Sequence, residues 1–205
     1  MKLLIAPVLT ALFIGAVLTF LTFSSASRNT DAKPDGPGSL ASLQKGDYPW
    51  SVGLESLKDR LNAAGLPALK SEGSVLHTHQ HLDIFVDGNR VNIPQGIGVN
   101  DATGFISPIH THEADGIIHV ESPNVQTFTL GQFFNVWGVR FDDNCLGSYC
   151  LANNKKLRVF VNGRQLQKGF QDLALEPQQE IVITYGTDGQ LPNPLPKSFN
   201  FLPGY

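Results

Sequence analysis

The sequence predicts one α+β domain in which a mixed sheet packs against a single helix. The alternation of apolar and polar residues that is typical of strands begins near residue 75 and returns in several short segments, two of which reach Asp-Gly or Asn-Gly turns. Only residues 128–139 change to a strong helical spacing of large apolar side chains. A chain of 205 residues is long enough for one well-packed core, but hardly for two independent ones.

The first 26 residues predict an export signal or a membrane anchor. Lys2 precedes an apolar run over residues 3–23, and small residues follow up to Ala26, where cleavage would fit the small-x-small rule. The run is also close to the ~20 residues that cross a bilayer, so an uncleaved transmembrane anchor is the alternative. Both interpretations place the remaining chain outside the cytoplasm, either periplasmic or extracellular, or anchored and facing outside.

Three further segments follow the signal. Residues 27–47 are polar and rich in Pro, Gly and Ser, which predicts a flexible linker. We expect the folded domain over residues 48–188 and a Pro-rich tail over residues 189–205 that wraps its surface. Within residues 51–69, apolar residues recur near the helical period before a Gly and a Pro, which predicts a short N-terminal helix docked on the domain.

The sheet begins with a hairpin over residues 81–94, whose turn is Asp87-Gly88 and whose first strand places Leu82, Ile84 and Val86 on one face. The helix over residues 128–139 presents a wide apolar stripe, and either Thr127 or Thr129 can cap its start. Residues 156–166 then predict a strand that enters an Asn-Gly turn. Residues 179–186 predict a closing strand.

This order of hairpin, helix, strand with an Asn-Gly turn and closing strand resembles the β-grasp order of ubiquitin-like and sulfur-carrier proteins over residues 80–186. The resemblance implies a β-grasp-like sheet with a His-rich hairpin inserted between the first hairpin and the helix. Sulfur-carrier activity does not carry over, because it needs a terminal Gly-Gly and this chain ends in LPGY. The runs HTHQHLDIFVDG and ISPIHTHEADGIIHVES are also similar to a family of uncharacterised exported bacterial proteins, which brings no chemistry with it.

Cys145 and Cys150 are the only two cysteines, and they are separated by four residues that include Gly147. In an oxidising compartment, such a pair is expected to close a small disulfide loop. We favour a structural disulfide over a redox centre, because the spacing is not the C-x-x-C of thiol oxidoreductases.

All six histidines lie between residues 77 and 119, namely His77, His79, His81, His110, His112 and His119. Since strand side chains alternate between faces, the first three point together, away from the predicted core. A four-residue connection over 113–116 would pair His110 with His119 and leave His112 on the same face. Paired Cβ atoms lie ~4.5–5.5 Å apart, so these imidazoles can reach one ion or two adjacent ones.

The pattern therefore predicts an extracytoplasmic transition-metal-binding protein, in metal handling, as a carrier or as a sensor. Imidazole suits Zn or Cu(II) best, with Fe(II) or Ni as further options, and the lack of any methionine after Met1 argues against a thioether Cu(I) carrier. Glu121 is expected on the face of His119 and Glu113 lies nearby, as possible ligands or proton acceptors.

Two other functions remain open at this stage. An ion held by three histidines with a vacant position can activate water in a hydrolase or hydratase-type enzyme, with Glu121 or Glu113 as the base. Alternatively, the cluster is a metal-free, pH-responsive interaction module, because neighbouring imidazoles repel once protonated. Nucleic-acid binding is not expected, since the net charge is −3 and Lys and Arg are scattered. The sequence does not indicate a protein partner.

Overall fold

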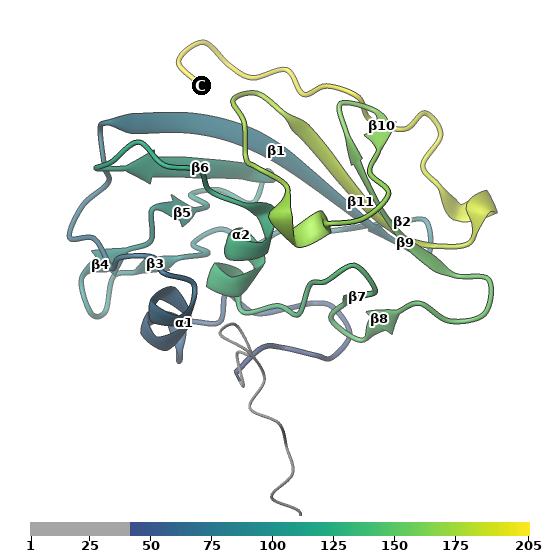
Figure 1. The fold of residues 1–205 in the computed structure, drawn as a ribbon, viewed down its shortest axis with the longest axis horizontal. Helices are drawn as coiled ribbons and strands as arrows, with labels where there is room; N and C mark the ends of the chain where they lie inside the picture. Colours follow the sequence, from purple (N-terminus) through teal and green to yellow (C-terminus); the bar gives the residue numbers. More distant parts are fainter. Residues whose placement is uncertain (1–41) are drawn as a thin grey trace, which may run out of the picture. The chain divides into compact units, whose positions relative to one another are not determined.

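The computed structural model describes residues 42–205 (Figure 1), and these form an α+β fold as predicted. The helices are α1 (Leu57–Ala63), α2 (Leu130–Trp137) and the 3-10 turns η1 (Phe170–Asp172) and η2 (Asp188–Gln190). The strands are β1 (Leu76–Val86), β2 (Asn89–Val91), β3 (Val99–Asn100), β4 (Phe105–Ile106), β5 (Ile109–His110), β6 (Ile117–Ser122), β7 (Cys145–Leu146), β8 (Tyr149–Cys150), β9 (Lys156–Val161), β10 (Arg164–Gln165) and β11 (Glu180–Gly186).

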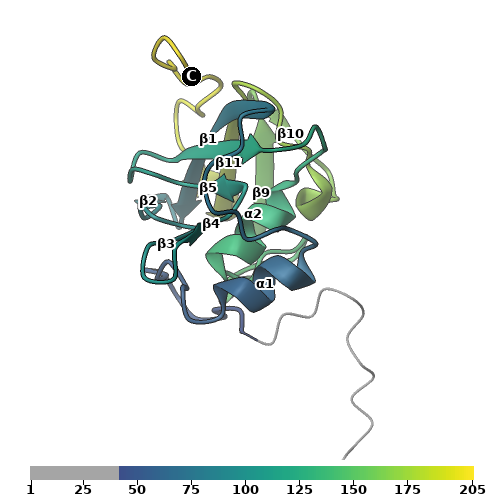
Figure 2. The ribbon, with the colours of Figure 1, turned by 90° about the vertical axis from the view of Figure 1, so that its left-hand side faces the viewer.

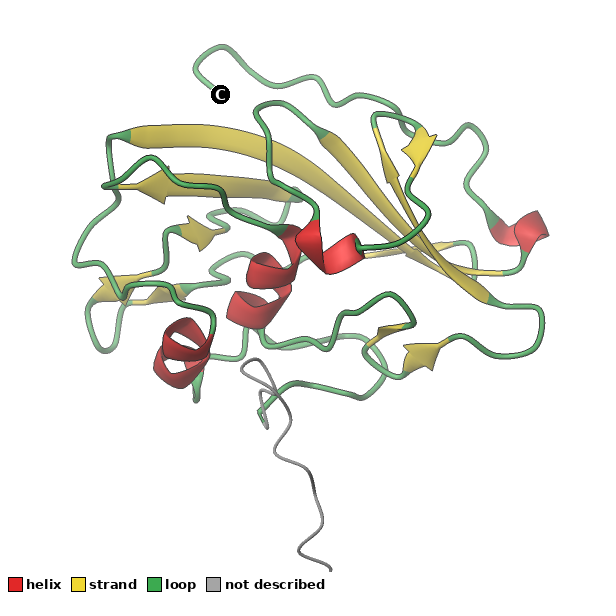
Figure 3. Ribbon diagram, in the orientation of Figure 1, coloured by secondary structure: helices red, strands yellow, loops and turns green. Residues whose placement is uncertain are grey.

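The main sheet is mixed and is organised around the long strand β1. Its strand order is β10-β9-β11-β1-β6-β5. One edge of β1 has two partners: β6 pairs with its N-terminal half and β2 pairs with its C-terminal end. β1 and β11 run parallel, whereas every other pair in this sheet is antiparallel. Helices α1 and α2 lie on one side of the sheet, and the C-terminal segment lies on the other (Figures 2 and 3).

The predicted faces of β1 are confirmed. Leu82 and Ile84 are fully buried in the same core as Phe133 and Phe134 of α2. Each fully buried large apolar side chain contributes roughly 1.5–3 kcal/mol, so this alternation fixes which residues of β1 face the other way. The histidines of β1 are therefore placed on the opposite side of the sheet from α2.

Local signals determine the ends of the main elements. The residues of the Asp87-Gly88 turn have φ values of 50° and 84°, the left-handed pair that a two-residue hairpin turn requires. Helix α2 begins with a capping box in which the Thr129 side chain accepts from the Gln132 N–H and the Gln132 side chain accepts from the Thr129 N–H. The predicted hairpin, helix, strand and closing strand are thus present in the predicted order, while membership of the β-grasp class stays a prediction.

Helix α1 is shorter than the expected segment, and its anchor is a charged residue. Arg60 is almost completely buried, and its guanidinium donates to the carbonyl oxygens of Asn135 at 2.8 Å and Val136 at 3.2 Å. These acceptors lie in the last turn of α2, where carbonyl groups lack the regular N–H donors of the helix interior. Helix α1 is thus docked by hydrogen bonds from the Arg60 guanidinium to carbonyl oxygens at the C-terminal end of α2.

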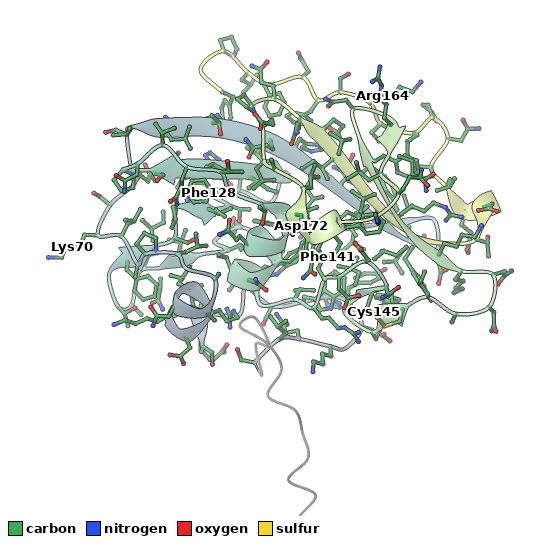
Figure 4. The ribbon with its side chains drawn as sticks, in the orientation of Figure 1. Lys70, Phe128, Phe141, Cys145, Arg164 and Asp172 are labelled. Carbon is green, nitrogen blue, oxygen red and sulfur yellow. A yellow bond between two sulfur atoms is a disulfide. The ribbon has the colours of Figure 1, made fainter. Side chains whose placement is uncertain are left out.

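The predicted disulfide is present. Cys145 and Cys150 are bonded to each other across the β7–β8 pair, and the Tyr185 hydroxyl donates to the carbonyl oxygen of Cys150 at 2.9 Å. Figure 4 labels Cys145 in this loop. The bond therefore closes a small loop against the end of β11, which agrees with the structural role expected from the spacing.

The prediction of a transmembrane segment needs correction. Between residues 42 and 205, no helix is long and apolar enough to cross a bilayer, and α2 has only 8 residues. The apolar run at 3–23 and the signal prediction for 1–26 lie outside the described residues. Of the predicted linker, the described part includes Gln44, whose N–H donates to the Gly138 carbonyl oxygen at 2.7 Å.

Candidate metal centre

Three neighbouring strands bring most of the histidines together. His110 of β5 is paired with His119 of β6, as predicted, and His119 is paired in turn with His79 of β1. In the next row of the same face, His77 of β1 is paired with Glu121 of β6. The sheet register therefore places four imidazoles and one carboxylate side by side.

The first group that can hold an ion comprises His110, His112, His119 and Glu121, and one ligand atom from each lies within 4.8 Å of all the others. The Nε2 atoms of His110 and His112 are 3.0 Å apart, and Nδ1 of His119 is 3.4 Å from Oε1 of Glu121. Two ligands at a bond length of about 2.1 Å are separated by about 3.0 Å at right angles and about 3.4 Å in a tetrahedron. These two separations match those of ligands of one ion, so this group could hold a metal.

The second group comprises His77, His79 and, again, Glu121. Nε2 of His77 lies 3.2 Å from Nε2 of His79 and 3.1 Å from Oε1 of Glu121. The His77 side chain is 54% exposed, whereas that of Glu121 is 5% exposed. This group therefore lies at the solvent-facing margin of the cluster and shares its buried carboxylate with the first group.

His81 does not join the other five histidines. Its Nδ1 lies 2.8 Å from Oε2 of Glu180, its Nε2 lies 3.1 Å from the carbonyl oxygen of Asp115, and its ring stacks on Phe199 with centroids 3.9 Å apart. His81, Asp83 and Glu180 form a third group of possible ligands. Because both ring nitrogens of His81 already face acceptors, a cation could enter there only by displacing one of them.

The orientation of His110 favours coordination. Its Nδ1 lies 2.9 Å from the carbonyl oxygen of Ser107, which accepts a hydrogen bond from that nitrogen. In the neutral ring, this contact leaves the lone pair on Nε2, the atom that faces His112. A backbone acceptor behind a ligating histidine is the usual way in which proteins fix its tautomer and direction.

The electrostatic environment keeps the inner imidazoles neutral. Burial and, next, the neighbouring His112 lower the pKa of His110 to about 4, and burial with His110 and other rings lowers the pKa of His119 to about 3. Burial also lowers the pKa of His79. Burial and the nearby Glu72 carboxylate raise the pKa of Glu121 to about 7. Neutral imidazole is the form that coordinates metals, so the rings need not lose a proton near pH 7.

Two glutamates at these sites were not identified from the sequence. Oε1 of Glu72 lies 3.2 Å from Nε2 of His112, and Glu180 is the partner of His81. Glu72 belongs to a loop without a periodic pattern, and Glu180 is brought to β1 by a long-range parallel pairing. Glu113, which was predicted as a possible ligand or base, is exposed and lies in none of the three groups found among residues 42–205.

The predicted tail covers the histidine face. The Tyr205 ring lies 4.6 Å from the His79 ring and 5.9 Å from the His119 ring, measured between centroids. This cover contributes to the burial of His79 and His119 on the face opposite to the core. An open cleft of about 650 Å³ reaches the cluster at His112 and Glu72, and Lys70, labelled in Figure 4, lies on its wall.

Comparison of the chain with protein-family models, with curated proteins and with solved structures finds no match in any of the three. The chemistry of the cluster therefore has to be inferred from its residues and their geometry.

Proposed function

We propose that this protein binds a transition metal ion outside the cytoplasm, at the group formed by His110, His112, His119 and Glu121. The observation that carries the proposal is that four ligand atoms, three of them from imidazoles, lie within 4.8 Å of one another. The intramolecular disulfide is compatible with an oxidising compartment outside the cytoplasm.

The donor set favours Zn or Cu(II). Imidazole nitrogen suits Zn, Cu, Ni and Fe, whereas Ca²⁺ and Mg²⁺ take oxygen ligands. Three nitrogens and one carboxylate oxygen also match the four-coordinate shell that Zn prefers. Ni and Fe(II) fit the same donors less specifically.

The contacts among these side chains are poorly explained without a cation. Nε2 of His112 faces two acceptors, Nε2 of His110 at 3.0 Å and Oε1 of Glu72 at 3.2 Å, and its one hydrogen atom can be donated to only one of them. Glu121 is buried and its carboxylate meets His77, His110 and His119 rather than a lysine or arginine. Buried charges are normally paired or coordinate metals, so a bound cation satisfies both features at once.

Metal handling, as a carrier or sensor, is the role we propose first. If Glu121 coordinates the ion, four protein ligands complete a tetrahedral shell, whereas hydrolytic sites keep one position open. The cleft beside His112 favours a second candidate, a metal-dependent hydrolase or hydratase-type enzyme in which Glu121 is the base and water takes the fourth position. A Co(II)-loaded sample separates the two by its visible spectrum, which distinguishes a closed protein shell from one that water enters.

The test is elemental analysis of the full-length protein, purified from an extracytoplasmic fraction without added metal. We expect at least one Zn or Cu per chain in the wild type and loss of the ion held by this group in the His110→Ala, His112→Ala double variant. The matched control is Glu113→Gln, an exposed neighbour outside the groups, which should keep its metal. Equal, negligible metal in all three proteins would overturn the proposal and favour the metal-free, pH-responsive module.

A further inference from the structure

The geometry points to a dinuclear centre: we propose that the cluster holds two ions of the same kind, bridged by the carboxylate of Glu121. This inference rests on the proposed metal binding and adds its stoichiometry and the bridging residue. One ion lies among His110, His112 and His119, and the other lies between His77 and His79.

The position of Glu121 carries the inference, because this residue is the one member common to both groups. Its Oε1 lies 3.1 Å from Nε2 of His77, and its Oε2 lies 3.9 Å from Nε2 of His110. Oε1 also lies 3.4 Å from Nδ1 of His119, so the carboxylate is in contact with histidines of both groups. A carboxylate that offers one oxygen to each of two ions holds them at the separation of roughly 3.5–4 Å that is found in two-metal sites.

The number and spread of the imidazoles exceed what one ion takes. A Zn site takes four ligands, whereas the two groups together offer five imidazoles and one carboxylate. The five histidines divide instead into two sets, with the Nε2 atoms of His77 and His79 at 3.2 Å and those of His110 and His112 at 3.0 Å. Each close pair provides two of the ligands that one ion requires, and His119 lies between the pairs.

The ring of His119 is in contact with both sets. Its centroid lies 4.6 Å from that of His79 and 4.6 Å from that of His112. Its Nδ1 is 3.4 Å from Oε1 of Glu121, so the ring and the carboxylate together occupy the space between the two pairs. Because its ligand nitrogen groups with those of His110 and His112 and not with those of His77 and His79, we assign it to the inner ion as the third nitrogen ligand.

Charge and access agree with two ions. Glu121 is buried at the centre, and Glu72 adds a second carboxylate at 3.2 Å from His112, so that two acidic groups offset part of the charge of two divalent ions. The side chains of His77 and His112 are 54% and 41% exposed. Each half of the centre therefore has an edge through which an ion can enter and at which water can complete its shell.

Copper titration with electron paramagnetic resonance tests the bridge on the full-length protein, with Cu(II) as the only added ligand. We expect two Cu(II) per chain and a spin integral well below the copper content, because a bridging carboxylate couples the two spins. In Glu121→Gln, the integral should rise to match the bound copper. The control Glu176→Gln removes an exposed charge outside the described groups and should leave the coupled signal unchanged.

A second variant keeps the inference testable if Glu121→Gln does not fold. The double variant His77→Ala, His79→Ala should bind one Cu(II) per chain with a full spin integral. One Cu(II) per wild-type chain would overturn the dinuclear centre while metal binding stands, and no Cu(II) would overturn both. Two Cu(II) with fully independent spins in the wild type would overturn the bridging role of Glu121.

Discussion

His79 on β1 and His119 on β6 are paired directly across the sheet, and their rings meet edge to face with centroids 4.6 Å apart. Protonation of either ring would create a positive charge in a buried site beside a second buried imidazole. Burial, assisted by the neighbouring rings, accordingly lowers the pKa of both residues. The same pairing that gathers ligands for an ion thus makes the ion-free cluster sensitive to acid.

We predict that the ion-free protein loses stability as the pH falls from 6.5 towards 4. The pKa values of His110 and His119 in the folded state, about 4 and about 3, lie below the ordinary value of 6.5, so the unfolded chain binds these protons first. Glu121 acts in the opposite sense, because its pKa rises from 4.5 to about 7 and the folded state gains a proton there. Between pH 6.5 and 4.5, the two imidazoles give the unfolded chain more additional protons than the single Glu121 carboxyl gives the folded state. The net effect is a loss of stability as the pH falls.

Urea unfolding at several pH values, with chelator present, checks this dependence. The free energy of unfolding should decrease from pH 7 to pH 5, and the decrease should be smaller in a His119→Gln variant, which removes one of the two titrating rings. A stability that stays constant or increases towards pH 5 would contradict the neutral, buried state of the inner histidines.

Metal removal should lower the melting temperature. A ligand that binds only the folded state stabilises it by about 2.7 kcal/mol at a free concentration of 100 times its dissociation constant. For a domain of this size, 1 kcal/mol corresponds to roughly 2–4 °C, so we expect a decrease of several degrees on adding a chelator. Differential scanning calorimetry measures the decrease, and the His110→Ala, His112→Ala variant, which keeps only the group of His77, His79 and Glu121, should show a smaller response to metal and to chelator.

Metal binding should release a proton from Glu121. Its pKa of about 7 means that the carboxyl is largely protonated at pH 6, whereas a ligating carboxylate must be ionised. Calorimetric titration with Zn(II) at pH 6, in buffers of different ionisation enthalpy, should report the release of about one proton. In Glu121→Gln this release should disappear, and an unchanged release would show that the proton comes from another group.

The tail should control how fast an ion leaves. Tyr205 covers His79 and His119, with centroid distances of 4.6 and 5.9 Å. Replacing it with Ala removes that cover but no described ligand, so transfer of metal to a coloured chelator should become several-fold faster. Leu202→Ala, an exposed residue of the same tail, is the control and should leave the rate unchanged. Equal rates for Tyr205→Ala and the wild type would show that the tail does not limit release.

The pairing of His110 with His119 could be predicted because it depends on a short connection within one hairpin. The pairing of His79 with His119 could not, because an inserted segment separates β1 from β6 and no turn fixes their register. The same reason applies to Glu180, which reaches His81 through the parallel β1–β11 pair. Alternation predicted the histidine face, but its burial under the tail depends on contacts for which the tail sequence has no periodic signal.

Substitution of Gly116 tests the connection over residues 113–116, which sets the pairing of His110 with His119. Its φ of +87° is unfavourable for any other residue, and an added Cβ would lie 2.6 Å from the Leu82 carbonyl oxygen and 3.0 Å from Nε2 of His81. Gly104 has a φ of +67° but no atom within 4 Å of an added Cβ. Replacing it therefore measures the free-energy cost of the positive φ alone, without a steric clash. Gly104→Ala should lower the free energy of unfolding by about 1–2 kcal/mol.

Gly116→Ala should cost more than Gly104→Ala, because backbone atoms must also move and the His81 contact with Asp115 is lost. Urea unfolding of both variants at pH 7 measures the difference. The cluster of His110, His112 and His119 should also bind Zn(II) more weakly in Gly116→Ala, since the connection sets how these residues face one another, whereas Gly104→Ala should bind normally. Equal costs in the two variants would mean that the connection is not held against β1, and the register of the metal ligands would then need another cause.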